Sequence, residues 1–466
     1  MGFRESSPQN SMAEIHPSVD VLHLCTVTPP HGSLVPFSLP LTFFDILWLR
    51  FPPVQRIFFY KSSAPFDVVV STLKNSLSAA LQHYPPLAGA VVWPENSPKP
   101  AVQTVLGDGI LLTLAKSSSN FSHLVSDGLR EAAEFHTLVP RLPAADDRAA
   151  VMALQVTSFG TDGFCIGITS HHAILDGRTS TSFVKLWARL CKNLVAGGES
   201  AEPVSSAAET MPFYDRSVIV DPRGLEGIFL RDWLAHGGSD NKSLKFWSPS
   251  TPQGLFRGTF KINPQNIQKL KQLVLNRRNP VHPPVHISTF TVAMAYTWVC
   301  TAVADGSPHD GEISFGLSVD ARRWLDPPVA ANYFGNCLVG RATDQERAKL
   351  VGENGLVTAV EGISKAIKSL EENGALDGAE QWVSLLTQVS GSNRKMLTTA
   401  GSPRFELYSV DFGWGTPAKV EVVSIDETGA VSVCDGRDGG VELGWVAQKD
   451  VMEAFAAAFA KGLREL

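Results

Sequence analysis

The stretch that decides the fold of this chain is Ser170-His171-His172-Ala173-Ile174-Leu175-Asp176-Gly177. Before it, apolar residues alternate with small ones over 164–168, which predicts a β-strand, and continuing the alternation places Ser170 and His172 on the apolar face. Gly177 permits a tight bend, and the apolar residues after it recur at helical spacing. His172 is therefore expected between a strand and a helix, facing a cleft. There a neutral imidazole can accept a proton from a hydroxyl. A hydrogen-bonded core histidine is the alternative interpretation of so short a motif.

Length and composition describe a globular protein with two or three domains. The chain has 466 residues, of which 44% are hydrophobic and 18% charged, and its formal net charge is −6. This charge gives no electrostatic reason to expect nucleic acid or an anionic membrane as a partner. The six cysteines show no Cys-x-x-Cys spacing, which favours reduced thiols in a cytoplasmic protein over disulfides or a zinc ribbon. They are Cys25, Cys165, Cys191, Cys300, Cys337 and Cys434.

The ends and the apolar runs of the chain predict no targeting or membrane segment. Residues 1–17 are polar and lack the apolar centre of a signal peptide. No run of about 18 apolar residues exists, and the apolar stretch 41–51 is too short to span a bilayer and contains Asp45 and Arg50. A cytoplasmic location without a membrane partner is therefore expected.

Periodicity and turn residues predict a chain that mixes strands with helices in both halves. A hairpin is expected from a strand that contains Met152, Leu154 and Val156 and a strand that begins at Phe164 and ends at His172, with its turn at 160–163. Residues 404–422 are expected as strand, loop and strand. Residues 195–212 are rich in Ala, Gly, Ser, Glu and Pro, which favours a linker. The other expected strands are 19–27, 89–93, 100–106, 110–115, 255–262 and 313–319, and the expected helices are 67–83, one from Pro264 capped by Asn263, 288–303 and 449–466.

A second motif, Asp411-Phe412-Gly413-Trp414-Gly415, specifies the family. Together with His172-x-x-x-Asp176-Gly177, in this order and at this separation, it closely resembles the plant BAHD acyltransferases. The resemblance extends over nearly the whole chain, and its nearest branch is the flavonoid and phenolic glycoside malonyltransferases. The further stretches that resemble family signatures are 41–45 (LTFFD), 84–89 (YPPLAG), 212–216 (PFYDR) and 332–337 (NYFGNC).

This resemblance implies an α/β fold with two similar domains of the chloramphenicol-acetyltransferase type. Each is a mixed sheet flanked by helices, and a solvent channel between them admits acyl-CoA from one side and the acceptor from the other. The implied division is an amino-terminal domain over 1–194, a crossover linker over 195–212 and a carboxy-terminal domain over 213–466. Family members are commonly monomers, so a monomer is expected.

The implied chemistry is direct transfer of an acyl group from a CoA thioester to an alcohol. His172 would deprotonate the acceptor hydroxyl, and the resulting imidazolium would protonate the departing sulfur. The chain has no Gly-x-Ser-x-Gly elbow, which favours direct transfer over an acyl-enzyme. No permanently bound cofactor and no metal are expected, and malonyl-CoA is the expected co-substrate.

Two aspartates have both a catalytic and a structural interpretation. Asp176 could complete a triad with His172, but the turn at Gly177 should aim its side chain away from the cleft, and the resemblance implies an ion pair, for which Arg322 is the candidate. Asp411 could act as a second proton acceptor, or it could form an ion pair that fixes the loop 412–415 beside the CoA channel. We favour the structural interpretation for both.

The donor and acceptor contacts are assigned by the resemblance and by charge. His286, Ser288 and Thr289 match donor positions at the start of a helix, whose free N–H groups suit a phosphate or carboxylate. Arg178 could hold a malonyl carboxylate, although some malonyltransferases place this arginine where the chain has Ser180. The other expected contacts are Arg404, Phe412, Gly413, Trp414 and Gly415 for CoA, and Thr42, Phe43, Phe44 and Asp45 for the acceptor.

Three other functions remain as alternatives to malonyl transfer onto a phenolic or flavonoid glycoside. An enzyme of the same family could use an aromatic or short aliphatic acyl-CoA. A non-catalytic small-molecule-binding relative could share the fold, and a hydrolase would release the free acid. Zinc binding by His282 and His286 is not expected, because Pro283 and Pro284 between them prevent a shared helical face.

Overall fold

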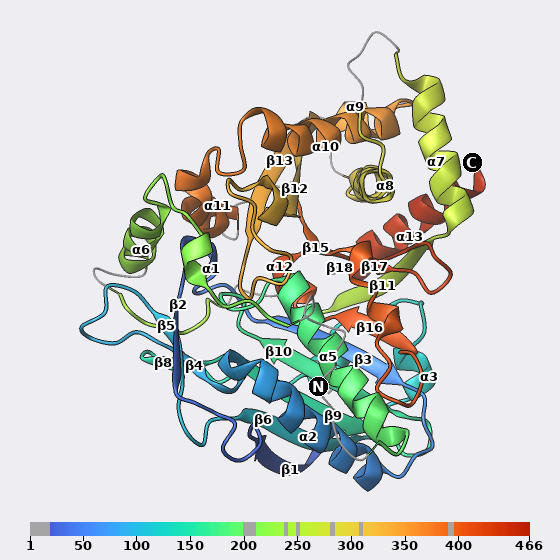
Figure 1. Ribbon diagram of the computed structural model, residues 1–466. Helices are drawn as coiled ribbons and strands as arrows, with labels where there is room; N and C mark the ends of the chain where they lie inside the picture. The colour runs from blue at the N-terminus through green and yellow to red at the C-terminus, as the bar shows by residue number, and fades with distance from the viewer. Residues whose placement is uncertain are drawn as a thin grey trace, which may run out of the picture.

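The computed structural model describes residues 19–198, 211–236, 241–247, 252–279, 285–306, 311–389 and 396–466. The linker predicted at 195–212 falls largely outside these ranges, as does His282 of the excluded zinc pair. The division of the chain into domains on either side of that linker stays a prediction. Within the described ranges the architecture is mixed α/β, with sheets flanked by helices (Figure 1).

Over the described residues the strands form four sheets, three of which mix parallel with antiparallel pairs. The six-stranded sheet consists, in spatial order, of β1 (Val19–Val27), β6 (Ile110–Ser117), β9 (Met152–Ser158), β10 (Phe164–Ser170), β3 (Val54–Tyr60) and β16 (Lys419–Val422). The five-stranded sheet consists of β15 (Thr399–Gly401), β17 (Val431–Asp435), β18 (Val441–Gln448), β11 (Leu255–Ile262) and β7 (Arg130–Glu131). The two smaller sheets are β13 (Leu338–Glu346), β12 (Glu312–Asp320) and β14 (Met396–Leu397), and β2 (Phe37–Pro40), β5 (Ala101–Thr104), β4 (Ala90–Val92) and β8 (Arg148–Ala150).

The helices cover the sheets and close the cores. The α-helices of the described ranges are α1 (Phe43–Ile46), α2 (Phe66–His83), α3 (Phe121–Leu124), α4 (Ala133–His136), α5 (Gly177–Val195), α6 (Leu225–Ala235), α7 (Pro264–Arg277), α8 (Thr289–Ala304), α9 (Arg347–Val351), α10 (Gly355–Glu372), α11 (Trp382–Val389), α12 (Ile425–Thr428) and α13 (Lys449–Arg464). Short 3₁₀ turns are η1 (Pro85–Ala88), η2 (Arg216–Val218), η3 (Arg322–Trp324), η4 (Ala379–Gln381), η5 (Pro403–Phe405) and η6 (Leu407–Ser409). None of these helices is long and apolar enough to cross a membrane.

The six-stranded sheet holds the histidine motif at the end of β10, just before α5. Strands β9 and β10 form the predicted antiparallel hairpin, in which Ser170 pairs with Met152. Helices α2 and α5 lie side by side against this sheet (Figure 1). Both have an apolar stripe that packs into the largest core cluster, as their helical spacing predicts. The turn after β10 is thereby held at the end of a buried hairpin.

The two large sheets exchange strands between the halves of the sequence. Strand β16, from the carboxy-terminal half, completes the six-stranded sheet by pairing with β3, and Figure 1 shows it in orange beside the blue and green strands. Strand β7, from the amino-terminal half, pairs with β11 at the edge of the five-stranded sheet. A sequence boundary near 212 therefore does not separate the hydrogen-bonded sheets.

The prediction of strand, loop and strand over 404–422 is wrong in its first part. Residues 403–409 form η5 and η6, and only Lys419–Val422 is a strand. The Ser402 hydroxyl accepts from the Arg404 amide, and Pro403 occupies the first position of η5. The Asp435 carboxylate accepts from the amides of Leu407 and Tyr408, at 2.6 and 3.2 Å. Asp435, 27 to 28 residues further along the chain, thus supplies hydrogen bonds in place of the strand pairing expected for this segment.

Candidate active site

His172 lies in a turn immediately after β10 and not on the strand itself. The strand ends at Ser170, the His171 amide donates to the Val151 carbonyl at 2.9 Å, and the Ile174 amide donates to the His171 carbonyl at 3.1 Å. The expected continuation of strand alternation to His172 is therefore wrong, because the backbone turns at His171. His171 is fully buried and its Nδ1 accepts from the Ala173 amide at 3.2 Å. It is the core histidine, whereas His172 is partly exposed.

Two aromatic rings contact the His172 imidazole and also contact each other. Trp48 stacks on it, with 4.1 Å between ring centroids and 14° between planes, and Phe51 approaches edge-on at 5.4 Å and 83°. The backbone of the turn is held from the other half of the chain, because Asn336 Nδ2 donates to the His172 carbonyl at 2.8 Å. Residues far apart in sequence thus fix both the ring and its backbone.

The environment of His172 keeps its imidazole neutral at pH 7. Burial lowers the pKa of His172 to about 4, although its own backbone carbonyl, the Asp176 carboxylate and Asn336 partly oppose this. Burial likewise lowers the pKa of His171 to about 3. A neutral imidazole that is partly exposed can accept a proton from a hydroxyl group, which is the first requirement of a general base.

Asp176 does not contact the imidazole but caps α5 and binds Arg322. Its Oδ1 accepts from the Thr179 amide at 2.8 Å, and its Oδ2 lies 2.7 Å from Arg322 Nη1. Both side chains are buried, at 1% and 3% exposure. Arg322 also contacts Asp320 Oδ1 at 3.0 Å. Although burial opposes it, the two carboxylates raise the pKa of Arg322 above its ordinary value. The pair predicted from the resemblance is thus formed, and it joins the turn after β10 to the end of β12.

Gly177 is needed for a close contact and not for a left-handed bend. A Cβ atom built on Gly177 would lie 2.6 Å from the Phe405 ring. The residue is the first of helix α5 and its φ is not positive. Any larger side chain would therefore push η5 away from the start of α5.

The loop 411–415 is fixed against α5 by Asp411. Its Oδ2 lies 2.8 Å from Lys192 Nζ, and its Oδ1 accepts from the amides of Gly413 and Gly415, at 2.7 and 3.0 Å. Although burial opposes it, Lys192 and these amides lower the pKa of Asp411. Gly413 has φ +103°, and a Cβ atom there would lie 2.7 Å from Val195 at the end of α5. This arrangement matches the structural interpretation of Asp411.

The aromatic residues of the same loop are core residues of unequal burial. Phe412 is fully buried and its ring contacts Trp187 at 4.8 Å and Tyr60 at 5.7 Å. Trp414 is partly buried and meets Phe164 edge-on at 5.4 Å. Of the loop's residues expected to contact CoA, Phe412 is therefore enclosed in protein.

The four residues expected to contact the acceptor are buried, which corrects that expectation. Phe43 and Phe44 are 1% and 0% exposed and pack in the largest core cluster. The Asp45 carboxylate accepts from Thr42 through its Oδ2 and from the Asn336 amide, at 2.9 Å, through its Oδ1. Because Asn336 in turn donates to the His172 carbonyl, this motif supports the histidine turn from behind and presents no open surface to a substrate.

The residues expected to contact the donor lie on three elements, of which the start of α5 and η5 pack against each other. Ser288 caps α8 by accepting from the Thr291 amide at 3.0 Å, with His286 exposed before it and Thr289 accepting from Lys271 at 3.3 Å. Arg178, at the start of α5, is half-exposed and its Nε donates to Asp320 at 2.8 Å. Arg404 is exposed in η5. The structure thus does not bring these residues together into one cluster.

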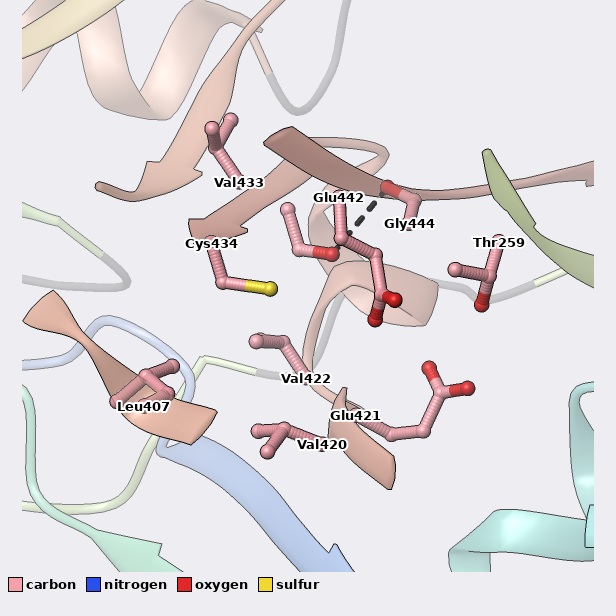
Figure 2. A pocket seen from close by; sticks show the side chains of 10 residues that line it. Thr259, Leu407, Val420, Glu421, Val422, Val433, Cys434, Glu442 and Gly444 are labelled. Atoms are coloured by element: carbon pink, nitrogen blue, oxygen red, sulfur yellow. Dashed lines mark hydrogen bonds between the residues drawn. The ribbon is translucent and has the colours of Figure 1, made fainter. Parts of the chain in front are cut away.

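A small cavity between the exchanged strand β16 and the five-stranded sheet is not a substrate pocket (Figure 2). Its volume of about 10 Å³ is that of one water molecule at most. Glu421 and Glu442 border it, and both are paired: Glu421 with Arg130 at 2.9 Å, and Glu442 with Lys419 at 3.2 Å. The cavity is therefore a packing gap in a neutralised ion cluster.

Comparison with known proteins identifies the family of this site. The sequence matches the family described as Transferase family over residues 18–461. Phenolic glucoside malonyltransferase 1 of Arabidopsis thaliana is 38% identical over 97% of this chain and 99% of its own length. The Arabidopsis thaliana malonyl-CoA:anthocyanidin 5-O-glucoside-6''-O-malonyltransferase is 37% identical over 97% and 100%. This chain belongs to the BAHD acyltransferase family.

The fold of the BAHD acyltransferase agrees with solved relatives. The crystal structure of vinorine synthase superposes with a TM-score of 0.67 over 94% of this chain and 96% of its own, at 18% sequence identity. The expected fold class is thereby confirmed. The family match and the two malonyltransferase relatives confirm the expected enzyme class, an acyltransferase of group EC 2.3.1.

Sequence reasoning missed the residues of this BAHD acyltransferase that hold the His172 ring and its turn. Trp48, Phe51 and Asn336 belong to no motif that assigns them a contact with His172. Asn336 lies within a quoted family stretch, 332–337, but only the fold brings it to the histidine. The sequence offered one signal for Trp48, which is that it follows the LTFFD stretch by three residues.

In Trp48→Leu, we expect kcat/KM to begin falling at a higher pH than in the wild type when the solution is made more acidic. The smaller side chain admits water to the imidazole, so the pKa of His172 rises from about 4 toward the ordinary 6.5. Protonation inactivates the base, so the acid limb of kcat/KM against pH moves to higher pH. As a control, Trp445→Leu removes a partly buried indole that packs on Phe455, and it should lower Tm without moving that limb. An unmoved limb in Trp48→Leu would contradict the role of the stack.

Proposed function

We propose that this enzyme transfers a malonyl group from malonyl-CoA to a hydroxyl of a phenolic or flavonoid glycoside, in the cytoplasm and as a monomer. The observation that carries the proposal is the neutral, partly exposed imidazole of His172, stacked on Trp48 and anchored through Asn336. Two relatives that match this chain over nearly its full length are named as malonyltransferases of phenolic or anthocyanidin glucosides, which supports the substrate class.

The proposed reaction is a direct displacement at the thioester carbonyl. His172 accepts the proton of the acceptor hydroxyl while the hydroxyl oxygen attacks the carbonyl carbon. The tetrahedral intermediate collapses, the carbon–sulfur bond breaks, and the imidazolium returns the proton to the CoA sulfur. The products are the ester and CoA thiol, so protons and electrons balance without an acyl-enzyme. General base catalysis contributes about 10²–10⁴-fold, and holding the two substrates in register contributes at least as much.

The other site residues have supporting roles in this proposal. Asp176 and Asp411 are positioning residues. Asp176 binds Arg322 and a backbone amide of α5, and Asp411 binds Lys192 and a backbone amide of its own loop. The start of α8, with Ser288, Thr289 and the preceding His286, is the proposed contact for an anionic part of the donor, since helix N-termini favour anions.

Incubation of the enzyme with an acyl-CoA and a phenolic glucoside tests the proposal. We expect free thiol to appear with malonyl-CoA only when the glucoside is present, and mass spectrometry to show the malonyl ester. Acetyl-CoA and coumaroyl-CoA serve as donor comparisons. Free malonic acid in place of the ester would indicate a hydrolase, and no thiol with any donor would indicate a non-catalytic relative. Either result would contradict the proposal.

A further inference from the structure

Arg56 is a buried cation for which the described residues supply no partner. Its side chain on β3 is 7% exposed, its Nε is buried without a hydrogen bond, and no ion pair or hydrogen bond joins its guanidinium to another described group. Burial lowers the pKa of Arg56 to about 10, so the group still carries its charge at pH 7. A buried charge without a partner is costly, and proteins rarely retain one without a use for it.

The other buried arginines of the described ranges all have partners. Carboxylates bind Arg130, Arg257 and Arg322, and backbone carbonyls bind Arg50 and Arg347. Among the buried arginines of the described ranges, Arg56 thus differs in having no partner. A carboxylate brought by a substrate would supply the contact that each of the others has within the protein.

Arg56 lies on the strand next to the one that leads to His172. Its Cα pairs with Ile168 of β10, and Val54, two residues earlier, pairs with Ser170 at the end of that strand. At ~3.3 Å per residue, the Arg56 Cα lies about 7 Å along the strands from that end. His172 follows two residues beyond Ser170, and its ring contacts Phe51 on the segment that leads into β3.

On its other side Arg56 faces the exchanged strand. Its Cα pairs with Val422 of β16. The titratable group that influences it is the Cys434 thiol of β17, and burial raises the pKa of that thiol well above its ordinary value, so at pH 7 it is neutral and does not balance the guanidinium charge. Arg56 therefore lies where the six-stranded and five-stranded sheets meet, close to the end of the hairpin that carries the base.

We propose that Arg56 binds the free carboxylate of the donor's acyl group, and so selects a dicarboxylic acyl-CoA over an uncharged one. The inference rests on the proposed function and adds a specificity residue to it. In a malonyl thioester the carboxylate is one methylene from the reacting carbonyl, so its counter-charge must lie near the base. A guanidinium is suited to the contact because its planar fork binds a carboxylate through two hydrogen bonds. Arg178, the arginine expected from the sequence, is already bound by Asp320.

The test compares Arg56→Met and Arg56→Lys with the wild type, using malonyl-CoA and acetyl-CoA with one phenolic glucoside. Arg56→Met is expected to lower kcat/KM for malonyl-CoA by about 10- to 100-fold, the size of a lost hydrogen bond to a charged group. For acetyl-CoA the change should stay within about threefold, and Arg56→Lys should be intermediate because it keeps the charge but loses the fork. The Tm of Arg56→Met should equal or exceed that of the wild type, because an unpaired buried charge has been removed.

Two matched variants separate specificity from structure. Arg347→Met removes a buried guanidinium that donates to the Ala302 carbonyl, so it should lower Tm and leave the malonyl-to-acetyl ratio unchanged. Arg178→Ala tests the competing arginine. Equal losses with both donors in Arg56→Met would overturn the role of Arg56 but leave the proposed function standing. A selectivity loss in Arg178→Ala but not in Arg56→Met would do the same. A wild-type enzyme that accepts only uncharged acyl-CoA would overturn the proposed donor as well.

Discussion

Replacing His172 by alanine is expected to lower kcat by about 10²–10⁴-fold, the usual contribution of a positioned general base. The residue is partly exposed and Asn336 anchors the turn through the His172 backbone, which the substitution leaves in place. The variant should therefore fold, bind acyl-CoA with nearly unchanged affinity and fail in the chemical step. Steady-state rates of thiol release with saturating donor and acceptor measure the loss.

The control for this variant is an exposed histidine, His123, which forms an ion pair. His123→Gln alters an exposed side chain on α3 that lies 3.1 Å from Glu134. This side chain is remote from the histidine turn in sequence. The His123→Gln variant should keep wild-type turnover. His172→Gln gives a second substitution that fills more of the space the imidazole occupies beside Trp48 and Phe51. Undiminished transfer by both His172 variants would show that another group removes the proton.

Replacing Arg322 by alanine is expected to lower the free energy of unfolding by about 3–5 kcal/mol, because it leaves the Asp176 carboxylate buried without its cation. The pair is 2.7 Å long and both side chains are at most 4% exposed. Two carbonyl acceptors, of Tyr333 and Gly335, lose their donor as well. Equilibrium unfolding in urea gives the change.

A double variant and a surface pair make this result specific. Arg322→Met combined with Asp176→Asn removes both charges, and it should recover part of the loss of Arg322→Ala. Lys349→Ala breaks the exposed pair between Lys349 and Glu346, also 2.7 Å long, and should cost less than about 1 kcal/mol. If Arg322→Ala were as mild as Lys349→Ala, the buried pair would not hold the histidine turn.

Local sequence signals predicted the elements around the site with good accuracy. The β9–β10 hairpin follows from alternation and a Gly-rich turn, and α7 follows from the Asn263 cap and Pro264. In these cases the deciding contacts lie within a few residues. The turns η5 and η6 were missed because Asp435, about 30 residues away, supplies the acceptor that replaces a strand.

The candidate site could be predicted where one motif carries the whole signal, and not where the fold assembles it. His172 and the pair of Asp176 with Arg322 follow from motifs and charge. Trp48 and Asn336 approach His172 from segments more than 100 residues away, so no local pattern marks them. Arg56 is recognisable only once its neighbours are known, because its distinguishing property is the partner it lacks.

The error at Phe43, Phe44 and Asp45 has the same origin. Aromatic rings and a carboxylate in a motif suggested contact with a flat substrate, but composition does not reveal which side of a segment faces the core. The carboxylate instead accepts from Asn336.

The exchange of β16 and β7 has a consequence for how the protein is made. Strand β3 emerges early in translation, but residues 419–422 that cover its free edge are synthesised last among the strands of that sheet. At about 5–20 residues per second, the edge waits roughly 20–70 s for its partner. An uncovered edge of this kind is a template for aggregation. Newborn chains should therefore depend on ribosome-associated chaperones, and truncation before residue 419 should yield insoluble product even though most of the six-stranded sheet is present.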